Sequence, residues 1–217
     1  MIINNKMFKR IEKKINLANL NIKPMAFVYI RLFTVIGIFL ILLLSSKYGY
    51  ILGPVFAILT YYLFEYICLD RVIVERMETL EKDALEYFPV FLNIFKNGKN
   101  IKNALEKTNE IVDNELTNEF SIVLDNVNLG KSLDEALLSV SKRIPSIMVN
   151  NIITDLTESN RLGNNIDNSI NLQLDLINEK RNKDIITDLR IIPFRIVIVF
   201  IVFVLIAIGL LFFSTLI

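Results

Sequence analysis

Histidine is absent from this sequence of 217 residues, and cysteine occurs only once, as Cys68. Metal sites made of histidine and cysteine ligands, and any disulfide within the chain, are therefore excluded. Nucleophilic catalysis of the serine–histidine or cysteine–histidine kind is excluded for the same reason. Asp and Glu are plentiful but spread along the chain, so no catalytic pair stands out. We expect no enzyme activity, no metal and no cofactor.

A complete phosphate-binding loop is also lacking. Gly130-Lys131-Ser132 resembles the end of such a loop, but the glycine required five residues earlier is Asp125. The preceding residues, 122–127, have a helical pattern where the motif needs a strand. The sequence therefore gives no reason to expect nucleotide binding at this site.

Long hydrophobic runs are what the sequence has in excess, since 53% of its residues are hydrophobic. Residues 25–44 and 50–69 are each long enough to cross about 30 Å of hydrocarbon, and only a short loop separates them. They predict a transmembrane hairpin over 25–69, and residues 191–217 predict a C-terminal transmembrane helix. Residues 25–44 are too long for a signal peptide and no cleavage site follows them.

Basic residues are concentrated before the first hydrophobic run, in the segment 1–24. By the positive-inside rule they place the N-terminus in the cytoplasm. An amphipathic helix lying on the inner membrane surface is an alternative explanation of the same charges. We expect Arg31 to extend toward the membrane surface. Glu65 could be a buried functional carboxylate, but its position one turn from the inner boundary favours contact with lipid headgroups.

Residues 70–190 have the opposite character, because Asp and Glu outnumber Lys and Arg by 21 to 15. This acidic balance argues against nucleic-acid binding. Apolar residues recur at spacings of three and four, which is typical of amphipathic helices, and no strand pattern competes. The sequence predicts an all-α membrane protein in which an antiparallel six-helix cytoplasmic bundle, 70–190, lies between transmembrane helices. Pro89 should kink or restart the first helix of this bundle, and Pro145 should lie in the first turn of the fifth.

One turn motif occurs three times in the bundle, with its glycines 32 and 33 residues apart. A glycine in the left-handed conformation ends one helix, and two residues later Asn or Ser caps the next. Glu135 could complete a capping box with the middle cap. The predicted structural turns are the glycines Gly98, Gly130 and Gly163 with the caps Asn100, Ser132 and Asn165.

These turns also carry a family resemblance, together with an Ile144-Pro145 pair and the spacing from Glu158 to Gly163. Their order resembles the type II secretion system protein F family, and within it the short inner-membrane platform proteins of Tad (type IVc) pili. The sequence of the central copy, in one-letter code, is LGKSLDEAL over residues 129–137.

The resemblance implies a non-catalytic platform in the inner membrane of a bacterial or archaeal cell. Such a platform couples a hexameric cytoplasmic ATPase to the assembly of pilin subunits, and can pair with itself or with a paralogous platform protein. Exposed Glu158 and Arg161 are candidates for an ATPase-facing surface. A transporter subunit, or a membrane-anchored scaffold or sensor, stays an alternative, although a transporter would be expected to place ionisable groups at mid-membrane.

Overall fold

The computed structural model describes residues 5–45, 49–162 and 166–183, and every regular element in these ranges is helical. The all-α prediction is therefore confirmed for the described part of the chain. The helices, in chain order, are α1 (Asn5–Leu17), α2 (Pro24–Ser45), α3 (Gly49–Glu65), the π-helix η1 (Tyr66–Asp70), α4 (Arg71–Gly98), α5 (Ile101–Ile111), α6 (Glu115–Asn128), α7 (Leu133–Ser141) and α8 (Ile147–Leu162). A last helix covers residues 167–183.

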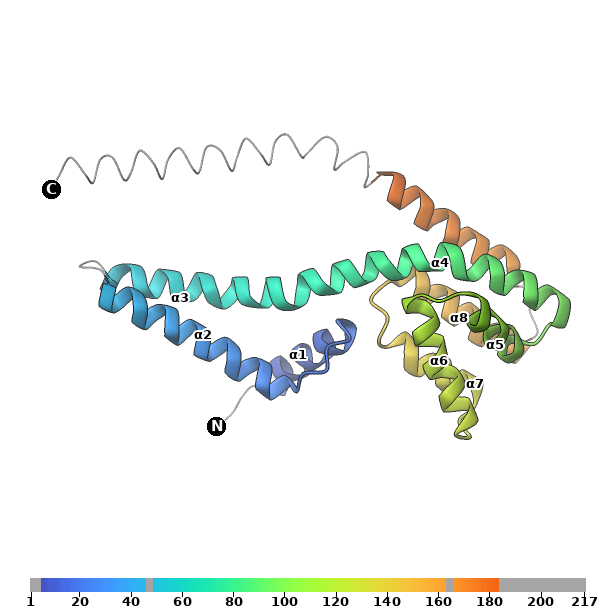
Figure 1. Cartoon of the computed structure of the whole chain (residues 1–217), viewed down its shortest axis with the longest axis horizontal. Helices are drawn as coiled ribbons and strands as arrows, with labels where there is room; N and C mark the ends of the chain where they lie inside the picture. Colours follow the sequence, from blue (N-terminus) through green and yellow to red (C-terminus); the bar gives the residue numbers. More distant parts are fainter. Residues whose placement is uncertain (1–4, 46–48, 163–165, 184–217) are drawn as a thin grey trace. The chain divides into compact units, whose positions relative to one another are not determined.

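Helices α2 and α3 pack against each other as an antiparallel pair (Figure 1). Their outward side chains are large and apolar, such as Phe33, Leu44 and Tyr62, all of which are exposed. Within the described residues, one helix is long and apolar enough to cross a membrane, through the window Pro24–Ile41 of α2. Helix α3 is equally apolar in character but has 17 residues before η1 begins.

Helix α3 continues through η1 into α4 without a loop, as the ribbon shows (Figure 1). Pro89 lies inside α4, and the helix runs on for nine more residues to Gly98. Of the two outcomes expected at Pro89, the restart is wrong, because α4 runs through the proline without a break, and the kink stays a prediction. A proline removes one backbone donor, but the neighbouring turns and the packing of Tyr87 and Phe88 into the core keep the helix continuous.

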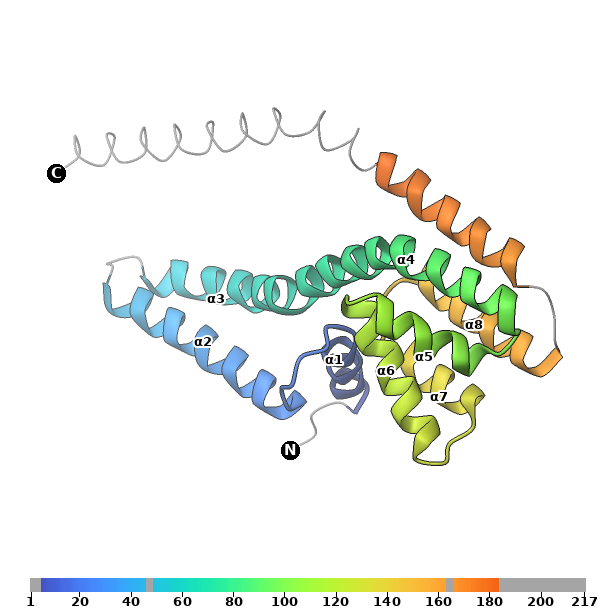
Figure 2. The ribbon, with the colours of Figure 1, turned by 45° about the vertical axis from the view of Figure 1, so that its right-hand side comes forward.

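Helices α4 to α8 lie beside one another (Figure 2), and aromatic side chains of α4 and α6 form a core among them. Tyr87 stacks on Phe120 with ring centroids 5.0 Å apart, and Phe88 meets the same ring edge-on at 6.0 Å. Both residues of α4 are fully buried, and the Tyr87 hydroxyl donates a 2.7 Å hydrogen bond to Asn109 Oδ1. Burial raises the pKa of Tyr87, so this hydroxyl stays protonated. The core thus fixes α4 to α5 and α6.

Helix α8 begins at Ile147 rather than at Pro145. Ser146 is fully buried and its hydroxyl accepts a 3.3 Å hydrogen bond from the Val149 N–H, as an N-cap does. The prediction that Pro145 lies in the first turn of this helix is therefore wrong, because the cap intervenes.

Helix α1 packs its apolar face on the protein itself. Ile11 and Ile15 are buried with Phe27 of α2 and Leu69 of η1 in one hydrophobic cluster. The alternative in which this face lies on the membrane surface is not what the structure shows, since protein side chains cover it.

The chain forms two compact units, residues 1–173 and 174–217. The helix 167–183 begins in the first unit and continues into the second, so the six-helix bundle stays a prediction. The predicted transmembrane helix at 191–217 lies outside the described residues.

Candidate functional site

The turn between α6 and α7 is built as the sequence predicts. Gly130 has φ +96°, its N–H bonds to the Val127 carbonyl at 2.9 Å, and the Lys131 N–H bonds to the Asn126 carbonyl at 3.1 Å. This pair of bonds defines a Schellman motif. Ser132 then caps α7, accepting a 3.2 Å hydrogen bond from the Glu135 N–H.

The turn between α4 and α5 differs from the prediction at its glycine. Gly98 is the last residue of α4, and Lys99 adopts the left-handed conformation with φ 49° and ψ 28°. The Lys99 N–H bonds to the Phe95 carbonyl at 2.7 Å, which is the single bond of an αL cap. The prediction for Gly98 is therefore wrong by one residue, because the helix includes the glycine. Asn100 caps α5 by accepting a 3.0 Å bond from the Asn103 N–H.

The third predicted turn, with Gly163 and Asn165, lies outside the described residues. The two ATPase-facing candidates just before it are both exposed on α8. Arg161 Nε is 3.3 Å from Asp134 Oδ2, and Asn160 donates to the other oxygen of the same carboxylate at 2.8 Å. Glu158 lies on this same exposed segment. The structure thus connects the start of α7 with the end of α8.

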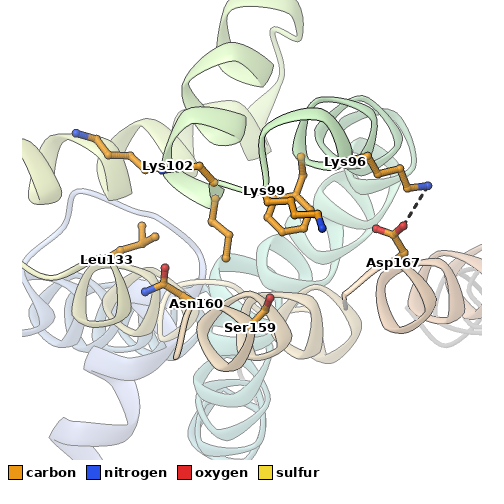
Figure 3. Close-up of a pocket in the computed structure, with 10 residues that line it drawn as sticks. Lys96, Lys99, Lys102, Leu133, Ser159, Asn160 and Asp167 are labelled. Carbon is orange, nitrogen blue, oxygen red and sulfur yellow. Dashed lines mark ion pairs between the residues drawn. The ribbon is translucent and has the colours of Figure 1, made fainter. Parts of the chain in front are cut away.

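A pocket of about 650 Å³ lies between the α4–α5 turn, the start of α7, the last turns of α8 and Asp167 (Figure 3). Phe95 and Ile101 give it apolar lining from α4 and α5, and Leu133 does so from α7. Its polar lining consists of Lys96, Lys99, Asn100, Lys102, Ser159, Asn160 and Asp167. We call this opening the lysine pocket.

The ammonium groups of the three lysines in the lysine pocket differ in their partners. Lys96 Nζ is 3.2 Å from Asp167 Oδ2, as the dashed line in Figure 3 marks. Lys102 turns its ammonium to Asn128, at 3.3 Å, so its aliphatic part lines the pocket. Among the described residues, the Lys99 ammonium makes no hydrogen bond and no ion pair.

The opposite end of α4 carries a buried ionic network around Arg76, which is 6% exposed. Its guanidinium reaches Glu115 and Glu119 at 2.6 Å each. It also donates to the Leu17 carbonyl at 2.8 Å and to the Arg143 carbonyl at 2.7 Å. One side chain of α4 therefore joins the end of α1, helix α6 and the α7–α8 connection.

The charge of Glu119 needs this network, because the residue is only 1% exposed and water cannot solvate its carboxylate. Its Oε1 also accepts from Arg143 at 3.3 Å, and Arg143 reaches Asn19 Oδ1 at 3.0 Å. Its Oε2 is buried without a partner in the part of the chain that the structure describes. A buried carboxylate of this kind is costly unless its positive partners stay in place.

A second ionic cluster lies at the base of the α2–α3 hairpin, next to η1. Arg31 is 3% exposed, places its guanidinium 3.5 Å from the centre of the Tyr61 ring and pairs with Glu65 at 2.9 Å. Lys14 of α1 reaches Glu65 at 2.7 Å and Asp70 at 2.6 Å. The expectations that Arg31 extends to the membrane surface and that Glu65 serves lipid headgroups are therefore wrong, because the two residues bind each other.

Within the described residues, no group of three Asp, Glu or Cys side chains could hold a metal ion. Both ionic clusters balance carboxylates with lysine or arginine, which leaves no free ligand set. Their chemistry is that of structural links between helices.

A family model for the type II secretion system (T2SS) protein F matches residues 89–213, more than half of the chain. This chain belongs to the T2SS protein F family. Proteins of this family are inner-membrane platform components of secretion and pilus machines and are generally non-catalytic. No curated protein and no solved structure gives a significant match.

The segment matched to T2SS protein F begins at Pro89, so it contains the lysine pocket but not Arg76 or the hairpin cluster. Sequence reasoning missed both ionic networks. A signal was present, because Arg76 lies four residues before Leu80 on the apolar face of α4, and Glu119 lies between Leu116 and Phe120 on that of α6. A charge on an apolar helix face predicts a buried partner.

Proposed function

We propose that this chain is the inner-membrane platform of a type IV pilus or type II secretion-like machine, and that it couples a cytoplasmic ATPase to pilin assembly. Membership of the T2SS protein F family supports a platform role. The observation that carries the coupling is the continuous helix from α3 through η1 into α4, which joins the apolar hairpin to the aromatic core without a flexible loop.

The proposed topology has cytoplasmic residues 1–24, a transmembrane hairpin over 25–69, a cytoplasmic six-helix bundle over 70–190 and a last transmembrane helix over 191–217. The apolar, exposed outer surface of α2 and α3 supports the hairpin, because lipid tails would cover those side chains. The short Tad pilus platforms are the members of the family that we propose as its nearest relatives.

The two ionic networks explain how motion of the bundle would reach the hairpin. Arg76 holds the end of α1 against α4 and α6. Lys14, in the last turn of α1, pairs with Glu65 at the end of α3 and with Asp70 at the end of η1. Helix α1 thus braces the junction from outside. An ATPase that displaces the bundle would move α3 with it, and this movement would change the space that pilins use between membrane helices.

The test is a pull-down of the tagged full-length protein from gently solubilised native membranes, with partners identified by mass spectrometry. Recovery of a hexameric secretion-type ATPase, with pilins or a second platform protein, is the expected result. Recovery of an ABC-type ATPase or a sensor kinase in its place would overturn the proposal. A second measurement in the same sample, crosslinking of the tagged protein to itself, tests whether the platform is a homo-oligomer.

A further inference from the structure

We propose that the lysine pocket binds an acidic segment of the ATPase that carries at least one apolar side chain. This inference rests on the proposed function and assigns the surface on which that partner acts. Three observations carry it: a Lys99 ammonium that has no partner in the described part of the chain, the apolar lining behind it, and the position of the pocket at the end of α4.

The helix dipole explains only part of the positive charge at the pocket. Cations in the last turn of a helix are favoured by its dipole, which accounts for Lys96 in α4. Lys99, however, holds a left-handed conformation that costs a non-glycine residue about 1–2 kcal/mol. A glycine there would avoid the cost, so the lysine occupies a position where the backbone disfavours it.

Lys102 lies in the first turn of α5, where the helix dipole disfavours a cation. Its ammonium is held by Asn128 and by Glu106 at 3.6 Å, and its hydrocarbon part faces the pocket. The domain around these lysines is acidic overall, so a local excess of positive charge is a departure from its surroundings. An acidic partner would be drawn to this opening and repelled by the rest of the surface.

The apolar lining of the pocket indicates that the partner also carries an apolar side chain. Phe95 stacks on Phe91 with centroids 5.8 Å apart, and together with Ile101 and Leu133 it gives the pocket an apolar wall. Asn160 adds an exposed amide at the rim. A carboxylate could bind Lys99 and share Lys96 with Asp167, while a neighbouring apolar side chain enters the pocket. A volume of about 650 Å³ is sufficient for a few side chains but not for a folded element.

The position of the pocket favours the ATPase over pilins or lipid. Helix α4 has 28 residues and at 1.5 Å per residue is about 42 Å long, and the pocket lies in its last turn, at the end away from η1. Pilins and lipid meet the hairpin end of this rod, whereas a cytoplasmic partner meets the other end. Force applied at the lysine pocket acts along the whole length of α4.

The deciding experiment measures capture of the purified ATPase of the same machine by the full-length protein in lipid nanodiscs. The test variant is Lys96→Gln with Lys99→Gly, which removes both ammonium groups without harming the helix or the left-handed turn. The matched control is Lys107→Gln with Lys142→Gln, two exposed lysines outside the pocket. Circular dichroism verifies that both variants fold.

We expect the pocket variant to bind the ATPase about tenfold more weakly, and the control to change binding by less than about twofold. A fluorescent polyglutamate peptide should show the same difference, and added salt should reduce it for the unmodified protein. Equal ATPase binding by the unmodified protein and both variants would overturn the pocket assignment and leave the platform role intact.

Failure of the unmodified protein to bind the ATPase at all would instead contradict the proposed function. A loss of self-association in the pocket variant, with ATPase binding unchanged, would also overturn the inference, because a second copy of the chain would then be the occupant.

Discussion

The two ends of helix α4 use charged residues in opposite ways. At the end next to η1, Arg76 is buried and contacts four acceptors from three other segments. At the other end, Lys96 and Lys99 are exposed. Lys99 has a left-handed backbone conformation, and its ammonium has no partner among the described residues. The first end is built to hold helices together, and the second is available to another molecule.

Stability and binding therefore depend on different ends of α4. A buried charge fixes geometry because breaking its contacts leaves groups that neither water nor protein satisfies. An exposed charge contributes little to folding, so it can serve a partner at small cost to the fold. The family match begins between the two ends, at Pro89.

The largest effect is expected at the buried end. Arg76→Ala removes the partner of a carboxylate that is itself buried, and should lower the free energy of unfolding by about 3–5 kcal/mol. Denaturant unfolding of the full chain in detergent, followed by circular dichroism, measures this. Arg71→Ala is the control, since the exposed Arg71–Glu75 pair should contribute less than about 1 kcal/mol. Similar losses in both variants would contradict the contrast.

The two glycines that end α4 and α6 should respond in opposite directions. Gly130→Val places a β-branched side chain at φ +96° and should destabilise the protein by about 1–3 kcal/mol. Gly98→Ala is helical and has open space at its Cβ position, so it should be neutral or stabilising by up to about 1 kcal/mol. Thermal unfolding of both variants checks this, and a large loss for Gly98→Ala would mean that the glycine, not Lys99, takes the left-handed conformation.

Lys99→Gly should stabilise the fold, because it relieves the left-handed lysine by about 1 kcal/mol, partly offset by the greater freedom of glycine in the unfolded chain. The matched comparison is Lys107→Gly inside α5, which should destabilise by about 1 kcal/mol. A stabilised variant that binds the ATPase more weakly would separate folding from binding at this end of α4. Unchanged stability would show that the turn costs little.

The smallest effect concerns Lys14, which ties α1 to η1. Burial alone would lower the pKa of Lys14, but the carboxylates of Asp70 and Glu65 outweigh it and hold the pKa above the usual 10.5. The stabilisation is therefore fully present below pH 10.5 and is lost as the pH rises through the raised value. The stability difference between the unmodified chain and Lys14→Gln should shrink in that range. A difference independent of pH would contradict the ion pairs.

Local features were predictable from the sequence, and long-range ones were not. The caps Asn100 and Ser132 and the left-handed Gly130 follow from short-range backbone chemistry, so nearby residues determine them. Gly98 was misassigned because either residue of Gly98-Lys99 can end the helix, and the packing of Phe95 and its neighbours decides. Arg31 was misassigned because its partner, Glu65, lies 34 residues away.

The lysine pocket likewise combines predictable turn residues with unpredictable packing. Its turn residues were predicted, yet the meeting of Lys99 with Leu133 and Asn160 requires knowledge of how α4, α7 and α8 pack. Sequence spacing does not contain that information. Glu158 and Arg161, chosen from the sequence, lie on the exposed segment that includes Asn160 of the pocket rim.

Coupling requires that α3, η1 and α4 move as one element braced by α1. Amide hydrogen exchange of the full chain in nanodiscs measures this directly, because protection reports how easily each segment opens. Residues 66–76 should be protected as strongly as the aromatic core around Tyr87, and Lys14→Gln should raise exchange in 66–76 and in α1 but not in that core. Rapid exchange at 66–76 in the unmodified protein, beside a protected hairpin and core, would show two independent parts and contradict the account.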